Sequence, residues 1–86
     1  MEKFVFLGTE RRVSKTGNTY FMLYFGSIID VKNGIGVVPN SSRIDNETFS
    51  DFTSLALGVE FECSYQKVYD QNNRPQIIIQ KYNINI

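Results

Sequence analysis

The stretch IDNETFSDFTSLALG, residues 44–58, decides the fold, because the spacing of apolar residues changes there from two to three and four. The residues with the new spacing are Phe49, Phe52, Leu55 and Ala56. Asp45 or Asn46 is suited to cap the start of a helix, and Gly58 stands where a left-handed residue often ends one. The segment therefore predicts one short amphipathic helix.

Three extended segments are expected before this helix. Residues 2–8 and 20–27 are predicted strands, with Gly17 and Asn18 at the bend of the polar turn between them. The remaining pieces predict a third strand or a short hairpin, with extended structure at 28–31 and 35–38, a turn at 32–34 and a break at 39–42.

Two strands are expected after the helix. The first alternates apolar and polar residues, and the apolar set that should face the core is Val59, Phe61, Cys63 and Tyr65. A polar loop at 70–75 precedes the second strand, at 77–86. The alternation in this last strand changes phase near Gln80 and Lys81, which predicts a bulge or a corner.

The resulting order is strand, strand, strand, helix, strand, strand. This is the order of an OB-fold, a five-stranded Greek-key barrel whose helix lies between the third and fourth strands. We therefore predict an all-β fold with one short helix, in a single OB-fold domain spanning residues 1–86. An SH3-like barrel and an open α+β sheet with the helix on one face are the structural alternatives.

Charge is balanced in total but not along the chain. The 86 residues include nine Lys and Arg and nine Asp and Glu, so the formal net charge is zero. Residues 33–62 contain one base and five acids, whereas both flanking parts are basic. The fold can therefore have one cationic and one anionic surface. No apolar run approaches the roughly 20 residues of a membrane span, and no signal-peptide pattern begins the chain. We therefore expect no membrane partner and a cytoplasmic location.

The composition favours binding over catalysis. Histidine is absent and Cys63 is the single cysteine, so no metal site, disulfide or cofactor is expected. The glycines near residues 17 and 34 lack the spacing of phosphate-binding loops. No serine or cysteine has an evident base partner, so the protein is not expected to be an enzyme.

The predicted strand at 20–27 is unusually rich in rings. Because neighbouring side chains alternate, they divide into two sets, with Phe21, Leu23 and Phe25 on one face and Tyr20, Met22 and Tyr24 on the other. The purely apolar set is expected in the core. The second set then points outward on a strand that helps form the binding face of an OB-fold, where tyrosine rings can stack on nucleobases. The alternative is that Tyr20 and Tyr24 cover a neighbouring strand or a dimer interface.

Basic residues gather near the two loops expected on either side of that face. They are Arg11, Arg12 and Lys15 near the first loop, and Lys67 and Arg74 around the second, with Tyr69 between them. Such cations can contact phosphates while Tyr20, Tyr24 and Tyr69 stack on bases. The sequence therefore predicts a site for single-stranded nucleic acid. Each basic residue taken singly is also compatible with an ordinary solvated charge.

The segment SKTGNTY, residues 14–20, resembles the gene V type single-stranded DNA-binding proteins of filamentous phages, and more loosely those of tailed phages and mobile elements. These families share a serine, a basic residue, a glycine and a tyrosine three positions later, and the matching residues are Ser14, Lys15, Gly17 and Tyr20. The resemblance implies that Lys15 lies in a DNA-binding loop and Tyr20 close to the DNA, and that Tyr69 stands in for a family aromatic. The chain departs from the family at Asn18, where family members commonly have a basic residue, and in its central helix.

The residues and the resemblance together predict a helix-destabilising protein that coats and protects single-stranded DNA during phage or mobile-element replication or transfer, with RNA left open as a ligand. The alternative is a small β-barrel adaptor that binds another protein through its exposed aromatic face. A homodimer is expected, because the family is commonly dimeric and because the apolar Ile84 and Ile86 of the last strand are suited to be covered by a second subunit.

Overall fold

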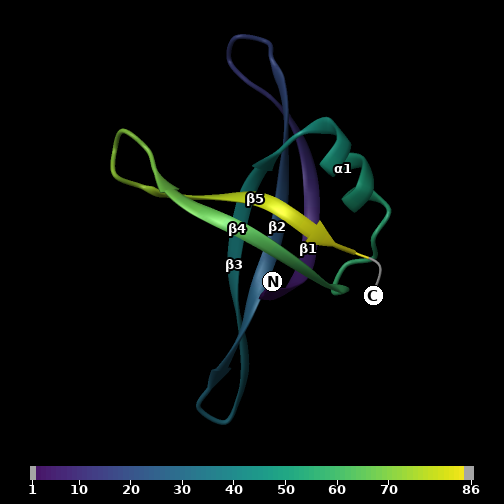
Figure 1. Ribbon diagram of the computed structural model, residues 1–86, viewed down its shortest axis with the longest axis vertical. Coiled ribbons are helices and arrows are strands. Elements are labelled where there is room, and N and C mark those ends of the chain that lie inside the picture. Colours follow the sequence, from purple (N-terminus) through teal and green to yellow (C-terminus); the bar gives the residue numbers. More distant parts are fainter. Residues whose placement is uncertain (1, 85–86) are drawn as a thin grey trace.

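The computed structural model of the protein describes residues 2–84 (Figure 1). Its elements follow one another as β1 (Glu2–Val13), β2 (Thr19–Val31), β3 (Gly34–Ile44), α1 (Asn46–Thr53), β4 (Glu60–Tyr69) and β5 (Pro75–Asn83). The strands form one antiparallel sheet in the order β3-β2-β1-β4-β5. The predicted all-β class, and the helix between the third and fourth strands, are confirmed.

The sheet is open but strongly curled. Its two end strands, β3 and β5, come within 8 Å of each other between Cα atoms, although no hydrogen-bonded ladder joins them within residues 2–84. In Figure 1 the hairpins β1–β2 and β2–β3 extend to opposite ends of the longest axis, and the β4–β5 hairpin projects to the side. The core lies inside the curl, and α1 covers one end of it.

Two β-bulges bend the sheet. In β1 the pairing with β2 skips from Phe6 to Gly8, so Leu7 is the extra residue, and Gly8 has a φ of 141° that glycine adopts easily. In β5 the pairing with β4 passes from Lys81 to Ile79, which leaves Gln80 as the extra residue. A bulge increases the local bend and twist of its strand. The second bulge confirms the phase change predicted from the sequence.

The hairpins are longer than predicted, and the predicted break in the third strand is wrong. Strand β3 continues through residues 39–42 to Ile44, and Pro39 pairs with Gly26 in the ladder. Proline has no N–H to donate, which is tolerated here because β3 ends the order of strands and has a neighbour on one side only.

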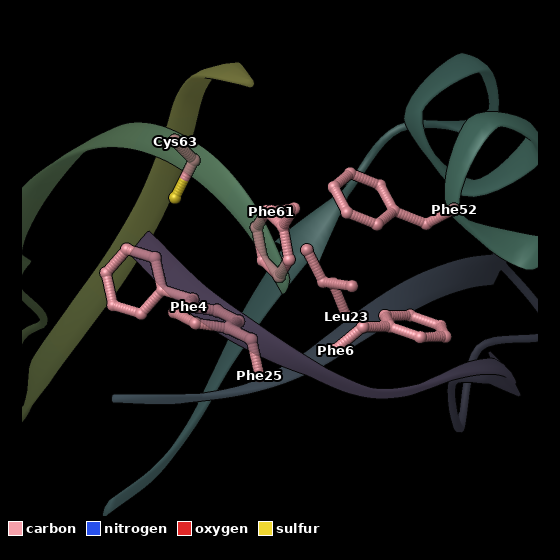
Figure 2. Packing of buried hydrophobic residues seen from close by; sticks show 7 residues of the cluster. All are labelled: Phe4, Phe6, Leu23, Phe25, Phe52, Phe61 and Cys63. Carbon is pink, nitrogen blue, oxygen red and sulfur yellow. The ribbon is translucent and has the colours of Figure 1, made fainter. Parts of the chain in front are cut away.

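The core consists of phenylalanines with one leucine and one cysteine, namely Phe4, Phe6, Leu23, Phe25, Phe52, Phe61 and Cys63 (Figure 2). Ring edges meet ring faces: Phe4 and Phe25 have centroids 5.0 Å apart at 81°, and Phe52 and Phe61 have centroids 5.0 Å apart at 76°. Such geometry adds about 0.5–1.5 kcal/mol per pair beyond the burial of the rings. The core is therefore held by packed rings from β1, β2, β4 and α1.

The predicted division of β2 into an inner and an outer set is also confirmed. Leu23 and Phe25 are fully buried, and Phe21 packs its ring on Phe49 of α1 at a centroid distance of 4.4 Å. Burial raises the pKa of the Cys63 thiol to about 11, in keeping with its predicted place in the core.

Helix α1 is fixed at its start and through one buried ring. Asp45 is the N-cap, and its carboxylate accepts a hydrogen bond of 2.8 Å from the backbone N–H of Thr48, which lowers the pKa of the acid. Phe52, the buried residue of the helix, contacts the rings of Phe6, Phe61 and Tyr82. The helix is thus docked on three strands at once.

The helix ends at Thr53, earlier than the sequence predicts. Gly58 does have a left-handed φ of 88°, but it belongs to the turn that leads into β4. There its N–H donates to the carbonyl oxygen of Phe6 at 2.8 Å. The glycine therefore ties this turn to β1 rather than ending the helix.

The apolar residues at the end of the chain that were expected to meet a second subunit are described only in part. Ile84 is half-buried and packs against the chain's own core, and Ile86 lies outside the described residues. Within residues 2–84, no helix is long and apolar enough to cross a membrane.

Replacing Phe52 with alanine should lower the free energy of unfolding by about 3–5 kcal/mol, because it leaves a cavity between the helix and the sheet. Urea denaturation followed by circular dichroism measures this loss. The matched control is Ser50→Ala at an exposed position of the same helix, expected within about 0.5 kcal/mol of the unaltered protein. A loss below about 1 kcal/mol for Phe52→Ala would show that the helix does not depend on this ring.

Candidate nucleic-acid interface

The outward side of β1, β2 and β3 carries a continuous polar and aromatic surface. Paired residues of antiparallel strands point to the same side, and the register pairs Tyr20 with Arg12, Met22 with Glu10 and Arg43, and Tyr24 with Ser41. We call this surface the tyrosine face; it comprises Glu10, Arg12, Tyr20, Met22, Tyr24, Ser41 and Arg43. The three predicted β2 residues are all half-buried on it.

The bulge at Leu7 decides which residues of β1 join this face. Before the bulge, Phe4 and Phe6 point into the core. The extra residue reverses the alternation, so that Glu10 and Arg12 point outward beside the tyrosines. Without the bulge, these two side chains would point inward.

Tyr20 is covered by a cation. The guanidinium of Arg43 lies 4.5 Å from the centroid of the Tyr20 ring, a cation–π contact of about 0.5–1 kcal/mol at an exposed site. A base needs about 3.5 Å of separation on each of its two sides, so it cannot enter between them. Arg43 would have to swing aside, which its exposed position allows. The sequence places Arg43 in the acidic middle of the chain, and only the β2–β3 register reveals its neighbour.

Tyr24, Glu10 and Arg12 form a linked triad that runs along the face from Tyr24 back toward Tyr20. The hydroxyl of Tyr24 donates to Glu10 Oε1 at 2.7 Å, and Arg12 Nε lies 3.3 Å from the same oxygen. The bond to Glu10 raises the pKa of Tyr24, and burial adds to the effect. The carboxylate of Glu10 offsets the charge of Arg12. The tyrosine face therefore keeps one net positive charge, that of Arg43.

Lys15 lies just beyond the face, in the loop between β1 and β2. This loop is closed by the N–H of Ser14 donating to the Asn18 carbonyl at 2.8 Å and by the Asn18 N–H donating to the Ser14 hydroxyl at 3.1 Å. Gly17 supplies the left-handed residue of the turn, with a φ of 87°. The exposed Lys15 therefore stands at the tip of a well-defined hairpin.

Arg11 is not brought to the tyrosine face, contrary to the prediction. It pairs with Phe21, whose ring packs on Phe49 of α1. Thr9, on the same side of β1, contacts Thr53 of α1 through their hydroxyl oxygens at 3.4 Å. Arg11 thus lies on the helix side of the sheet.

Lys67 lies on the far side of β3 from Tyr24. A cleft of about 320 Å³ separates the β3 edge from the β4–β5 hairpin, and Lys67 lines it together with Ser41, the register partner of Tyr24. The cleft therefore continues the tyrosine face around the edge of the sheet, and Lys67 is its cation.

Tyr69 and Arg74 are farther out, at the end of the β4–β5 hairpin. Tyr69 is 61% exposed, and the backbone N–H of Arg74 is held by the carboxylate of Asp70 at 2.9 Å. Among the described residues, no hydrogen bond or ring contact joins them to the tyrosine face. The predicted site therefore falls into a compact part on β1–β3 and a separate part on this hairpin.

Comparison with known proteins gives no match for the chain. No protein-family model matches it, and neither the curated proteins nor the solved structures compared with it give a match. In the part of the chain from Glu2 to Ile84, no three His, Cys, Asp or Glu side chains are grouped so as to hold a metal ion. The function of the protein therefore has to be inferred from the geometry of the tyrosine face.

The bond between Tyr24 and Glu10 predicts a specific alkaline titration. It raises the pKa of Tyr24 above the ordinary value of 10.0. Its contribution to stability is therefore present below the unfolded pKa and lost as the pH rises through the folded one. Glu10→Gln should shift this titration to lower pH in a tyrosinate absorbance experiment.

Tyr24→Phe is the control for that titration, because it removes the titrating group and identifies its part of the absorbance curve. Superimposable curves for the unaltered protein and Glu10→Gln would contradict the assigned bond.

Proposed function

We propose that the protein binds single-stranded nucleic acid without sequence preference, and that it coats and protects single-stranded DNA in phage or mobile-element replication or transfer. The observation that carries the proposal is the tyrosine face, on which Tyr20, Met22 and Tyr24 form a row flanked by Arg12 and Arg43. Rings that stack on bases and cations that contact phosphates are the two components of such sites.

The strand order supports an OB-fold as the basis of this function. An OB barrel opened between its third and fifth strands has the order β3-β2-β1-β4-β5 seen here, and β3 and β5 do approach each other. OB-folds bind oligonucleotides on strands 2 and 3, between the loops that join strands 1 to 2 and 4 to 5. Here that region contains Tyr20, Tyr24 and Lys15, with Lys67 across the β3 edge.

The spacing of the two tyrosines favours contacts to different nucleotides. Four residues along a strand span about 13 Å, whereas stacked bases repeat every 3.4 Å or so. A ring stacks on any base, and each such contact is worth about 1–3 kcal/mol. Bases of a duplex are already stacked on one another, so a surface of this kind favours single strands.

When a nucleobase binds at Tyr20, Arg43 exchanges one contact for another. The guanidinium leaves the Tyr20 ring when a base arrives, and it then becomes available to a phosphate. The weak cation–π contact is replaced by a base–ring stack and a charged contact, so the exchange is favourable. Arg12 is less free, because its charge is shared with Glu10.

A protein-binding module is the second candidate. It is favoured by the carboxylate of Glu10 on the tyrosine face, which repels phosphates, and by the zero net charge of the chain. Exposed tyrosines with an arginine also suit a protein interface. A titration with single-stranded DNA separates the two candidates.

Binding to poly(dT) should quench the intrinsic tyrosine fluorescence at low salt, and moderate salt should weaken it. Tyr20→Ala should weaken binding by about 1–3 kcal/mol, or about 5- to 150-fold in the dissociation constant. Tyr20→Phe is the matched control, because it keeps the ring and should retain most of the affinity. If the unaltered protein shows neither quenching nor a mobility shift at low salt, the nucleic-acid proposal is wrong.

Lys15→Ala should mainly reduce the salt dependence of binding, lowering the slope of log K against log salt by about 0.7 to 1. Lys32→Ala is the matched control, because Lys32 is also an exposed loop lysine but lies at the tip of the opposite hairpin. Equal slopes for Lys15→Ala and the unaltered protein would exclude Lys15 from the phosphate contacts.

A further inference from the structure

The cleft between the edge of β3 and the β4–β5 hairpin lies beside the tyrosine face, but the stacking contacts proposed above do not use it. In Figure 1 the β4–β5 hairpin crosses β3, and Cα atoms of β3 and β5 come within 8 Å of each other. The volume of the cleft, about 320 Å³, is at the lower end of the roughly 300–1,000 Å³ of small-molecule sites. A space of this size suits one nucleotide.

The lining of the cleft combines apolar surface with a few polar groups. It includes Pro39, Asn40 and Ser41 on β3, Lys67 on β4, and Pro75 and Ile77 on β5. The two prolines and the isoleucine offer apolar surface to the faces of a planar ring. Sites for small molecules typically have such a lining, in which a few polar groups fix the orientation of the ligand.

Asn40 gives the cleft a hydrogen-bond acceptor of fixed orientation. Its Nδ2 donates to the Ser27 hydroxyl at 3.2 Å and to the carbonyl oxygen of Val38 at 3.3 Å, which uses both hydrogens of the amide. Its Oδ1 accepts no hydrogen bond from residues 2–84. Because no buried side-chain oxygen or nitrogen of those residues lacks a partner, this oxygen is open to a ligand.

A free carbonyl oxygen selects a ligand that donates a hydrogen bond. Cytosine has an amine at C4, which donates, whereas thymine and uracil have at the same position a carbonyl oxygen, which only accepts. A carbonyl facing Asn40 Oδ1 leaves both oxygens without a donor, and an unmatched polar group costs binding free energy. Asn40 therefore favours a base that carries an amine, and the small volume of the cleft favours a pyrimidine over a purine.

Lys67 supplies the charge for the phosphate of the same nucleotide. It is exposed, and its ammonium group, which has three donors and no acceptor, forms no ion pair within residues 2–84. Ser41, which lines the same cleft, is the register partner of Tyr24. Paired Cα atoms of antiparallel strands lie about 4.5–5.5 Å apart, so a strand that stacks on Tyr24 has the cleft directly beside it.

We propose that one nucleotide of the bound strand enters this cleft, where Asn40 Oδ1 accepts a hydrogen bond from the C4 amine of a cytosine and Lys67 contacts its phosphate. The inference rests on the proposed function, because the tyrosine face holds the rest of the strand. It adds a preference for cytosine at one nucleotide to contacts that elsewhere accept any base.

The dissociation constants of oligodeoxycytidylate and oligodeoxyuridylate of equal length test the proposal, measured through tyrosine quenching at low salt and neutral pH. The two bases have the same ring and differ in the amine or carbonyl at C4 and in the proton at N3. The unaltered protein should bind the cytosine ligand about 2- to 12-fold more tightly, the fold-change that corresponds to one net hydrogen bond. Asn40→Leu should reduce this ratio by the same factor, and comparing the two ratios cancels any difference in how the bases stack on the tyrosines.

Gln66→Leu is the matched control and should leave the ratio unchanged. Gln66 is an exposed amide that bonds Gln80, and the alternation along β4 places it on the opposite side of the hairpin from Lys67. Ser27→Ala is the second variant, because it removes one of the two acceptors that orient the Asn40 amide and keeps the Asn40 oxygen. It should also lower the ratio, and it tests the same contact if circular dichroism shows that Asn40→Leu does not fold.

Equal ratios for the unaltered protein, Asn40→Leu and Ser27→Ala would overturn the cytosine preference. The proposed function would then still stand, because both oligonucleotides would bind. A ratio that Gln66→Leu lowers as much as Asn40→Leu would overturn the preference as well. If neither oligonucleotide quenches the fluorescence of the unaltered protein, the cytosine preference and the proposed function fail together.

Discussion

The strict alternation of side chains along β2 is the constraint on which the rest of the structure depends. Leu23 and Phe25 are fully buried in a core that is mostly phenylalanine, and they fix the orientation of the whole strand. A shift of one residue in the register would place Tyr20 and Tyr24 in that core and leave its rings in water. The same packing that stabilises the fold therefore presents the tyrosines on the outside.

Local patterns were sufficient for much of the fold. The capped helix, the division of β2 into two faces and the bulge at Gln80 each depend on the spacing of neighbouring residues, and all were predicted. Features that depend on the pairing of one strand with another were not predicted. Pro39 is tolerated because β3 ends the order of strands, and Arg11 faces α1 because the bulge at Leu7 reverses the alternation of β1. The spacing of apolar residues in the sequence does not reveal that bulge. Arg43 was missed for a related reason, because the ring that it contacts, Tyr20, lies on the adjacent strand.

Strand β2 carries two surfaces of different chemistry. Its first half holds rings and hydroxyls near arginines, whereas its second half, residues 27–31, has aliphatic side chains on both sides. In the proposed function, a chain of zero net charge binds phosphates through the arginines beside the first half of this strand, Arg12 and Arg43.

The most direct measurement is a ¹⁵N–¹H NMR titration of the labelled protein with an oligothymidylate at low salt, which reports on every backbone amide at once. We expect the largest shift changes at residues 10–12, 19–24 and 41–43, with smaller ones at Lys15 and Lys67. Changes confined to residues 27–38 of the β2–β3 hairpin or to the end of the β4–β5 hairpin, or no changes at all, would contradict the assignment of the tyrosine face as the nucleic-acid site.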